Sequence, residues 1–469
     1  MDMDLYPAPL KRIGGTKWGY IDSRGAWRIP PIFSHAEDFG ETGLAGAGRD
    51  GKTGVIDAAG RFVVPPVYDW IDGYREGRAI AVSGGDWYVI DAAGRVLTPR
   101  PYAYIGPYSA GRALFLRRAG DGRDLYGYLD RAGREAIPAS FPEAGGFTAE
   151  GKATVKIADG EYALIDTEGR RLAAYRYAYV GSLGDGLLPF RREENGPYGY
   201  IDESGRVAIE PRFTGAQPFE NGRAVVNTAP DFGGDYAIID RAGRFLTEPT
   251  FDDIRLLGAG RAAIGLAADP ERPVLGMSYA LADAESGRFL TGFRFRSISD
   301  YRCSLASVTD DEFTYFIGID GKPAPGLPRW RGGGSLDFPG GCLMVRANID
   351  LRISYYNRAL GQTVWTRNTA IPLAPPWVVR EHKYKPNPDY LVYYPQVSGI
   401  ADPAARERAN VALGELSGVK PLPPGPLDYT YTGDFDVAFF RGTLVVFELN
   451  GYRYPRGAAH GMPSLIYAH

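Results

Sequence analysis

Cysteine and histidine are scarce in this chain. Its 469 residues include two cysteines, Cys303 and Cys342, and four histidines. Two cysteines exclude a disulfide-framework fold and a four-cysteine zinc site, and they leave a single disulfide open. The histidines share no zinc-ligand spacing, and no HExxH, GxSxG or CxxC motif occurs. The sequence therefore predicts a protein that is not an enzyme, with no catalytic residue, no metal and no cofactor.

Long apolar runs and blocks of one charge are also missing. No stretch of 18 apolar residues exists, so no integral membrane segment is expected. Residues 1–15 lack the basic and apolar regions of a secretory signal. We therefore expect either a cytoplasmic protein or an extracytoplasmic one whose signal lies outside this chain. The net charge of -3 and a pI of about 6.0 argue against a nucleic-acid partner.

Glycine, proline and tyrosine are abundant. Glycine makes up 62 of 469 residues, about 13%, against a usual ~7%, and proline 36, about 8%, against ~5%. The chain also contains 31 tyrosines. Turn formers combined with aromatic residues favour many short strands joined by tight turns.

A short motif of the form Ile-Asp-x-x-Gly recurs along most of the chain. Successive members are 34 to 43 residues apart, and a period in this range indicates a repeat architecture. The motif position is occupied by Asp22, Asp57, Asp91, Asp130, Asp166, Asp202, Asp240, Asp283, Asp320 and Asn357. We expect each aspartate to accept backbone N–H groups in a turn that the glycine closes with a positive φ.

Each period reads as about three short strands, with a proline step and a Gly-Arg-Ala segment after the turn. The predicted fold is mainly β: an array of about nine or ten three-stranded repeats over residues 11–370. An open, solenoid-like array is favoured over a closed propeller. Roughly 36 residues are few for a four-stranded blade, and nine or ten copies are many for a ring.

One segment imitates a nucleotide-binding loop. Residues 46–53, GAGRDGKT, fit the pattern GxxxxGK(S/T). A strand-like segment with Pro65 and Pro66 follows, where a phosphate site needs the start of a helix. We therefore interpret the stretch as part of a β-hairpin that binds no nucleotide.

The repeats resemble the WG-repeat, or KWG-repeat, family of bacterial proteins. The similarity lies in GTKWGYIDSRG at Gly15–Gly25 and PYGYIDESGRVAIEPRF at Pro197–Phe213. It extends over roughly residues 11–325, although Trp-Gly itself occurs once, at Trp18–Gly19. The resemblance implies an all-β interaction region without catalytic residues.

The last hundred residues follow another pattern. Residues 370–377 and 383–389 are rich in proline and suggest a linker. A strand is expected over 390–400, a helix over 402–416, and two strands joined at Arg441–Gly442. Ala405, Ala409, Ala412, Leu413 and Leu416 would form the apolar stripe of that helix. Residues 376–469 are therefore expected to form a small α/β domain.

This segment resembles an extracytoplasmic domain of unknown function. That domain is found in peptidoglycan deacetylases and in a lysozyme-binding anti-sigma factor. The similarity lies in YYPQVSG at Tyr393–Gly399, in the helix with Asn410, and in GAAHG at Gly457–Gly461. The family's fold continues further than His469, so either the domain is truncated or the resemblance is partial. It implies recognition of a partner at the cell envelope.

Three residues of this segment are the candidate binding residues. Tyr452 and Tyr454 alternate on one face of an expected strand, and His460 follows in a glycine-rich loop. Tyrosine clusters at Tyr102–Tyr108 and Tyr175–Gly181 could serve sugar or peptide recognition, although core packing is the simpler reading. Carboxylates such as those of Thr309–Phe313 are read as turn residues.

The sequence favours a non-catalytic binding or scaffold protein of the bacterial envelope that recognises protein or cell-wall glycan. One alternative is an accessory part of a peptidoglycan-processing enzyme, and another is a cytoplasmic interaction scaffold. The oligomeric state is left open.

Overall fold

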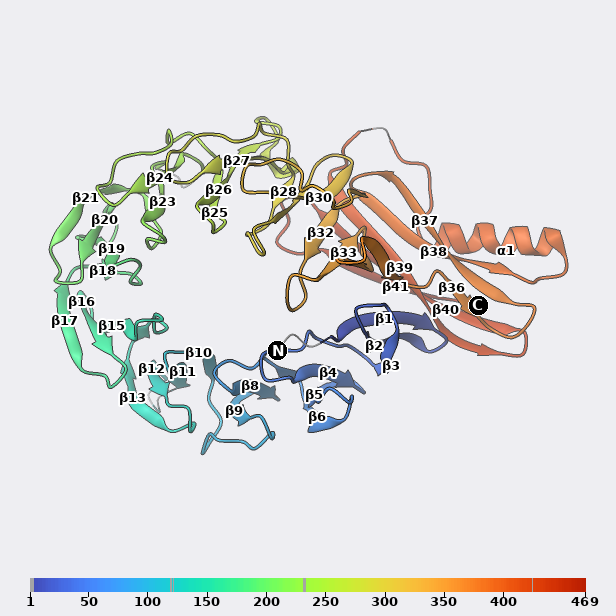
Figure 1. Ribbon diagram of the computed structural model, residues 1–469, viewed down its shortest axis with the longest axis horizontal. Coiled ribbons are helices and arrows are strands. Elements are labelled where there is room, and N and C mark those ends of the chain that lie inside the picture. The colour runs from blue at the N-terminus through green and yellow to red at the C-terminus, as the bar shows by residue number, and fades with distance from the viewer. Residues whose placement is uncertain (1–3, 119, 121, 231–232, 424) are drawn as a thin grey trace.

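The fold is almost entirely β. The computed structural model describes residues 4–118, 120, 122–230, 233–423 and 425–469. These residues form eleven sheets, ten of three or four strands and one of six. Figure 1 shows the small sheets following one another around a ring, with the six-stranded sheet and the one α-helix of the described residues at one side.

The first five small sheets are antiparallel, and each is built from consecutive strands. They are β1(Tyr6–Arg12), β2(Gly15–Ile21) and β3(Trp27–Phe33); β4(Ala45–Arg49), β5(Lys52–Ile56) and β6(Phe62–Tyr68); β7(Trp70–Ile71), β8(Arg78–Ser83) and β9(Asp86–Asp91); β10(Tyr104–Ser109), β11(Arg112–Arg118), β12(Asp124–Leu129) and β13(Glu135–Phe141); and β14(Glu143–Ala144), β15(Lys152–Ala158), β16(Glu161–Asp166) and β17(Arg171–Arg176).

The next five have the same order and direction. They are β18(Tyr179–Val180), β19(Leu187–Arg191), β20(Tyr198–Asp202) and β21(Val207–Phe213); β22(Gly215–Ala216), β23(Arg223–Asn227) and β24(Tyr236–Asp240); β25(Asp253–Leu256), β26(Arg261–Ala267) and β27(Met277–Asp283), with the 3-10 turn η1(Pro273–Leu275); β28(Ser297–Ile298), β29(Ala306–Thr309), β30(Phe313–Ile317) and β31(Trp330–Arg331); and β32(Gly334–Asp337), β33(Met344–Ile349), β34(Arg352–Asn357) and β35(Gln362–Thr366).

Each small sheet contains one copy of the sequence motif, so the repeat prediction is confirmed. In the first copy, Oδ1 of Asp22 accepts hydrogen bonds from the backbone N–H groups of Arg24 and Ala26, both at 2.9 Å. Gly25 closes the turn with a φ of 82°. The tenth copy substitutes asparagine: Oδ1 of Asn357 accepts the N–H of Ala359 at 2.9 Å. The predicted roles of aspartate and glycine in the turn are therefore confirmed.

The core is divided into clusters that lie between neighbouring sheets. The sixth and seventh sheets, for example, share Tyr200 and Phe213 with Val226 and Ile239, all at most 1% exposed. A corresponding cluster lies between the tenth sheet and the first, where Tyr6 and Ala8 pack with Tyr355. Ten sheets thus meet across ten interfaces, one more than an open row of ten sheets contains.

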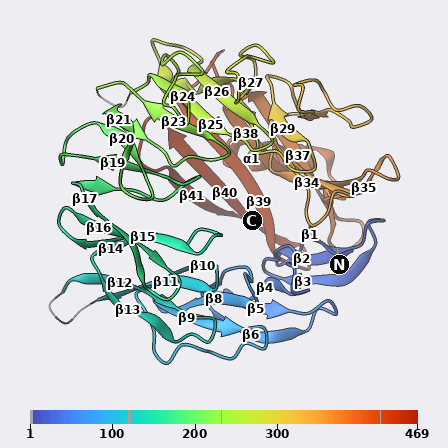
Figure 2. The same cartoon turned by 60° about the vertical axis from the view of Figure 1, so that its left-hand side comes forward.

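The array therefore curves back on itself. The sequence predicted about nine or ten β repeats, which is confirmed. It also favoured an open arrangement, whereas the contacts between the first and tenth sheets are those of the propeller-like alternative. Figures 1 and 2 show the ring from two directions. The last strand of a sheet lies toward the outside, as β6, β13 and β17 do in Figure 1.

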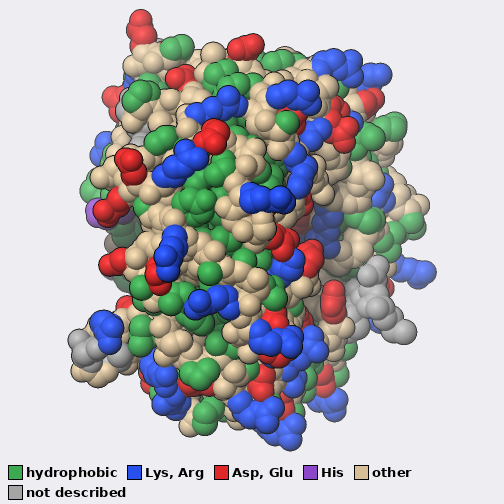
Figure 3. Space-filling view, turned by 90° about the vertical axis from the view of Figure 1, so that its left-hand side faces the viewer, with side chains coloured by type: hydrophobic (Ala, Val, Ile, Leu, Met, Phe, Trp, Pro, Cys, Tyr) green, Lys and Arg blue, Asp and Glu red, His purple; other side chains and the backbone are tan. Residues whose placement is uncertain are grey.

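The outer strands carry features that discourage edge pairing. Pro30, Pro65, Pro138 and Pro211 lie in β3, β6, β13 and β21, where each removes a donor from a sheet edge. Figure 3 shows one side of this outer wall, on which Lys and Arg side chains are spread among acidic and hydrophobic ones.

The final sheet has six strands, in the order in which they occur in the chain. They are β36(Ala370–Pro372), β37(Val378–Asn387), β38(Tyr390–Ser398), β39(Tyr429–Arg441), β40(Leu444–Pro455) and β41(Met462–Ala468). Only β38 and β39 run parallel, and α1(Pro403–Leu416) lies between them in sequence. Residues 370–372 and 383–387 of the two proline-rich stretches belong to β36 and β37, so the interpretation of these stretches as a linker was wrong.

The helix begins as the sequence predicts. Asp402 caps it, accepting the N–H of Ala404 at 2.9 Å, and Pro403 is its first residue. The predicted apolar stripe is only partly correct. Leu413 is buried, but Leu416 is 47% exposed, because the helix rests on the sheet through its Ala405–Leu413 side. None of the described helices is long and apolar enough to span a membrane.

Candidate functional site at the junction of the ring and the C-terminal sheet

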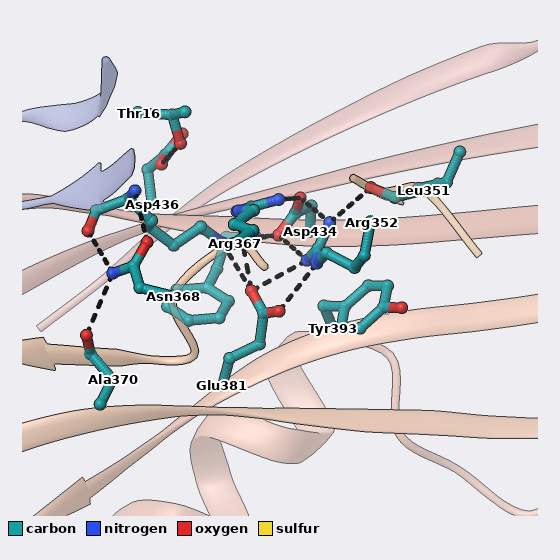
Figure 4. A network of polar contacts seen from close by, with 12 residues as sticks. Thr16, Leu351, Arg352, Arg367, Asn368, Ala370, Glu381, Tyr393, Asp434 and Asp436 are labelled. Carbon is teal, nitrogen blue, oxygen red and sulfur yellow. Dashed lines mark hydrogen bonds and ion pairs between the residues drawn. The ribbon is translucent and has the colours of Figure 1, made fainter. Parts of the chain in front are cut away.

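A buried network of charges joins three separate parts of the chain (Figure 4). Lys11 comes from β1, Arg352 from β34, and Glu381 and Asp434 from the six-stranded sheet. The ammonium group of Lys11 lies 2.8 Å from Oδ1 of Asp434 and 3.1 Å from Oε2 of Glu381. Arg352 contacts the same two carboxylates at 2.9 and 2.7 Å. The network therefore fixes the six-stranded sheet against both ends of the ring.

Aromatic rings and backbone groups complete this network. Lys11 Nζ lies 3.7 Å from the centre of the Phe435 ring, and the Arg352 guanidinium lies 3.5 Å from that of Tyr393. Asn368 accepts the N–H of Lys11 at 2.9 Å and donates to its carbonyl oxygen at 2.7 Å. The side chains of Lys11 and Glu381 are 1% and 3% exposed, so these charges are held out of water and depend on each other.

Burial and ion pairing shift the pKa values of Asp434 and Lys11 in opposite directions. Burial alone would raise the pKa of Asp434, but Lys11 and Arg352 outweigh it and lower the pKa to about 2. Burial lowers the pKa of Lys11 despite its acidic partners. It also raises the pKa of Asp436, whose Oδ1 accepts a hydrogen bond from Thr16 at 3.1 Å. The network is a structural clamp in which every charged group sees a counter-charge.

A cleft of about 860 Å³ opens beside the clamp. One wall consists of the β29–β30 turn, with Asp310, Asp311 and Glu312, and of the glycine run 332–334. The β33–β34 turn and the β37–β38 hairpin form the other sides. The volume lies within the range of small-molecule sites. Neither the repeats nor the C-terminal sheet forms this cleft alone, so we take it as the candidate functional site.

Two lysines share one carboxylate on the cleft wall. Lys383 and Lys385, two residues apart on β37, reach the two oxygens of Asp350 at 2.5 and 2.6 Å. The N–H of Gly333 donates to Asp350 at 3.2 Å. Burial would raise the pKa of Asp350, but the two lysines outweigh it and hold that pKa below its usual range. The acidic wall is likewise paired, since Asp310 and Asp311 contact Arg329 and Arg296 at 3.2 and 3.0 Å.

The sequence-predicted binding residues lie on the C-terminal sheet and do not line this cleft. Tyr452 and Tyr454 lie on β40, where Tyr452 is 45% exposed and Tyr454 is half-buried. The Tyr454 hydroxyl donates to the carbonyl of Ala458 at 2.7 Å, and the Tyr452 hydroxyl accepts the N–H of Gly461 at 3.1 Å. His460 is exposed in the loop between β40 and β41. The three residues are therefore neighbours, and both hydroxyls help to hold that loop.

The tyrosine clusters divide between core and surface. Tyr102, Tyr108 and Tyr175 are at most 5% exposed and belong to the packing between sheets. Tyr104 is 38% exposed, and Tyr179 is half-buried at the start of β18. The division between Tyr102 and Tyr104 falls at a boundary between sheets: Tyr102 bridges to Trp87 of the third sheet, and Tyr104 begins β10 of the fourth.

The segment that resembles a phosphate loop is a hairpin, as its context predicts. Residues 46–53 run through β4, its turn and the start of β5. Lys52 lies 2.5 Å from Asp69 at the surface, with the side chains 46% and 44% exposed.

The two cysteines form a disulfide, which settles the pairing that the sequence left open. Cys303 and Cys342 are bonded with their Cα atoms 5.9 Å apart. The bond connects the ninth sheet to the tenth, next to the point of ring closure. Arg302 supports the same contact through a hydrogen bond to the carbonyl of Gly340 at 2.5 Å.

The sequence analysis missed most cleft residues. Lys383 and Lys385 fell in the proline-rich segment interpreted as a linker. The Lys-Tyr-Lys alternation at 383–385 was the available sign of a strand with one charged face. Asp350 could not be found in this way, since its role depends on contacts with residues more than 30 positions away.

Comparison with known proteins identifies the repeats. The family described as "WG containing repeat" matches residues 18–52, 54–87, 126–162 and 198–228. These four segments are WG repeats. They correspond to parts of the first seven sheets, and the same Asp-turn geometry continues to Asn357 in the tenth. A search of curated protein sequences gave no match.

Several solved structures are similar to this chain at low identity. BamB from Moraxella catarrhalis is 14% identical, covers 70% of this chain and 97% of its own, and has a TM-score of 0.31. Sqt1 from Saccharomyces cerevisiae is 10% identical over 77% of this chain and 97% of its own, with a TM-score of 0.33. Apo AztD from Citrobacter koseri is 12% identical over 71% and 93%, with a TM-score of 0.30. At these scores, no functional argument rests on them.

Proposed function

We propose that the protein is a non-catalytic binding protein whose WG-repeat ring and C-terminal sheet together receive a partner in the junction cleft. The observation that carries this proposal is the origin of the cleft. Its walls come from the ninth and tenth sheets and from β37–β39, which the charge clamp holds in one arrangement. A rigid site built where two units meet is typical of recognition surfaces.

A binding role also fits the state of the cleft carboxylates. A general acid or base needs a pKa near the working pH, and an acid obtains this from burial without a counter-charge. Here Asp350 has two lysine partners, and Asp310, Asp311 and Asp389 each contact an arginine. At Asp350 the two lysines hold the pKa below its usual range, which suits positioning and charge complementarity more than proton transfer.

We further propose that the protein works in the bacterial envelope, with protein or cell-wall glycan as its partner. The disulfide supports an oxidising compartment, because cytosolic thiols are kept reduced. The similarity of residues 376–469 to extracytoplasmic domains agrees with this location and remains a prediction. Thiol quantification on protein from native cells tests the compartment: two free thiols would favour the cytoplasmic scaffold.

Site-specific photo-crosslinking tests the cleft. A photoreactive amino acid would replace Leu351, which lines the cleft and is 52% exposed. Its matched control is Leu172 on the outer strand β17, which is 51% exposed. We expect a discrete adduct with an envelope protein or with glycan from position 351 alone. Equal labelling from both positions would contradict the proposal. Release of new peptidoglycan fragments by the purified protein would favour the enzymatic alternative.

A further inference from the structure

Arg191 is a cation without a counter-charge in a position where other repeats supply one. It ends β19, between Tyr179 on β18 and Tyr198 on β20. Its guanidinium lies 5.3 Å from the centre of the Tyr179 ring and 5.0 Å from that of Tyr198. Among the described residues, no carboxylate lies within ion-pair distance of Arg191, and its buried Nε has no hydrogen-bond partner.

The ring contains two internal controls for this position. In the fifth sheet, Lys156 stands directly between Glu143 and Tyr162. In the tenth, Arg346 stands between Asp337 and Tyr355. The cation therefore has a tyrosine on the following strand in all three sheets. On the preceding strand, the innermost of its sheet, the residue is an acid in two sheets and a tyrosine in the sixth.

The acids in the other two sheets neutralise their cations. Lys156 lies 2.9 Å from Glu143, and Arg346 lies 2.8 Å from Asp337. In the sixth sheet Tyr179 occupies the acid's place, and Glu193 and Glu194 in the next turn form no ion pair with Arg191. The two tyrosine rings instead fix the guanidinium plane through cation–π contacts. A fixed guanidinium with free donors matches the two oxygens of a carboxylate.

We propose that Arg191 binds a carboxylate of an acidic polypeptide segment, at the inner edge of the sixth sheet. This inference rests on the proposed binding role and names the chemistry of a partner. A polypeptide fits better than an acidic glycan, because sugar rings are usually recognised on open aromatic faces. The rings of Tyr179 and Tyr198 already face the guanidinium, and Tyr179 also packs against Tyr162 and Tyr198 at 6.3 and 5.7 Å.

Fluorescence anisotropy at low ionic strength tests the site. The probe is a fluorescein-labelled peptide of alternating Gly and Glu, with a Gly–Lys peptide of equal length as the charge control. We expect only the acidic peptide to bind, and Arg191→Gln to weaken it at least about tenfold, as for a lost charge-assisted bidentate contact. Arg192→Gln is the matched control. Arg192 is the next residue, it pairs with Glu210 at 2.9 Å, and its loss should leave affinity unchanged.

The variant Tyr179→Glu distinguishes a binding role of Arg191 from a purely structural one. It restores the acid found in the fifth and tenth sheets, so Arg191 gains an internal partner. We expect peptide binding to fall as in Arg191→Gln while the melting temperature stays level or rises. Unchanged affinity in either variant would overturn the proposal. Binding of polygalacturonate in place of the Glu peptide would overturn the polypeptide assignment. Crosslinking at Leu351 that persists without any peptide binding would leave the cleft proposal standing and remove this one.

Discussion

The hydroxyl of Tyr355, in the tenth sheet, donates a hydrogen bond of 2.7 Å to the backbone carbonyl of Pro7, in the first. The two residues are 348 positions apart in the sequence. Tyr355 is fully buried, and its ring packs against that of Tyr6 at 5.8 Å. This contact belongs to the interface between the tenth and the first sheets, so it helps to close the ring. The repeated sequence motif describes single repeats and does not predict such a contact.

Removal of the Tyr355 side chain should open the ring at that interface. We expect Tyr355→Ala to cost about 3–5 kcal/mol, because it leaves a cavity and an unpaired carbonyl. Hydrogen exchange should rise most in β1–β3 and β32–β35. Tyr200→Ala is the matched control, with an equally buried tyrosine bonded to Gln217 at 2.7 Å. The prediction fails if both variants change exchange in the same segments.

A substitution in one repeat turn should disturb mainly the adjoining sheets. Gly205 has a φ of 86°, and a Cβ there would lie 3.2 Å from the Tyr175 ring. We expect Gly205→Val to cost roughly 1–3 kcal/mol of stability. Gly146→Ala serves as the control, since it has open space and no positive φ. Exchange that rises evenly around the whole ring would show that the repeats unfold as one unit.

Lys52 should contribute nothing to nucleotide binding. It belongs to a hairpin and pairs with Asp69 at the surface, where an exposed ion pair contributes little to stability. We expect Lys52→Ala to leave the melting temperature nearly unchanged and calorimetry to detect no ATP binding in either protein. Micromolar ATP binding that disappears in the variant would show this interpretation to be wrong.

Acid should weaken the charge clamp. The pKa of Asp434 is about 2 in the folded protein, below its ordinary value of 3.8. A depressed folded pKa stabilises the protein above the unfolded pKa, and this contribution is lost as the pH falls from about 4 to about 2. We expect Asp434→Asn to melt lower than the wild type at pH 7 and to lose less stability across that window.

Asp428→Asn provides the comparison for Asp434→Asn. Asp428 lies in the same part of the chain and contacts Arg272 at 2.6 Å, but its side chain is 87% exposed. Its replacement should leave the acid limb of the stability curve as in the wild type. If the wild type and both variants lose stability in parallel as the pH falls, Asp434 does not contribute to the acid sensitivity of the fold.

Tyr452 and Tyr454 should affect partner binding more than folding. Their rings are partly exposed, but their hydroxyls bond to the loop that carries His460. We expect the double alanine variant to weaken binding to an envelope partner and to lower the melting temperature by no more than a few degrees. The double Phe variant separates ring contacts from loop anchoring. Unfolding of the alanine variant, or stoichiometric zinc at His460, would contradict this assignment.

Local features of the fold could be predicted, and long-range ones could not. The Asp-x-x-Gly turn follows from two residues whose chemistry acts within four positions, as at Asp22 and Gly25. The cap at Asp402 is equally local. No local sequence pattern predicts the contact between Tyr355 and Pro7 that closes the ring, because a core tyrosine is expected in an open array as well. The cleft was missed for the same reason: Asp350 and Lys383 are ordinary charges until folding brings them together.

The order in which the chain is made has a bearing on how this ring must assemble. Strand β1 needs partners that are synthesised much later, since Lys11 contacts Asp434, which lies 423 positions further along the chain. Until those arrive, the first sheet presents Tyr6, Ala8 and Ile21 without their covering neighbours. The tenth sheet of another molecule offers the same complement, so crowded nascent chains could link head to tail. Dilute synthesis, or a chaperone holding the N-terminal strand, would favour closure within one molecule.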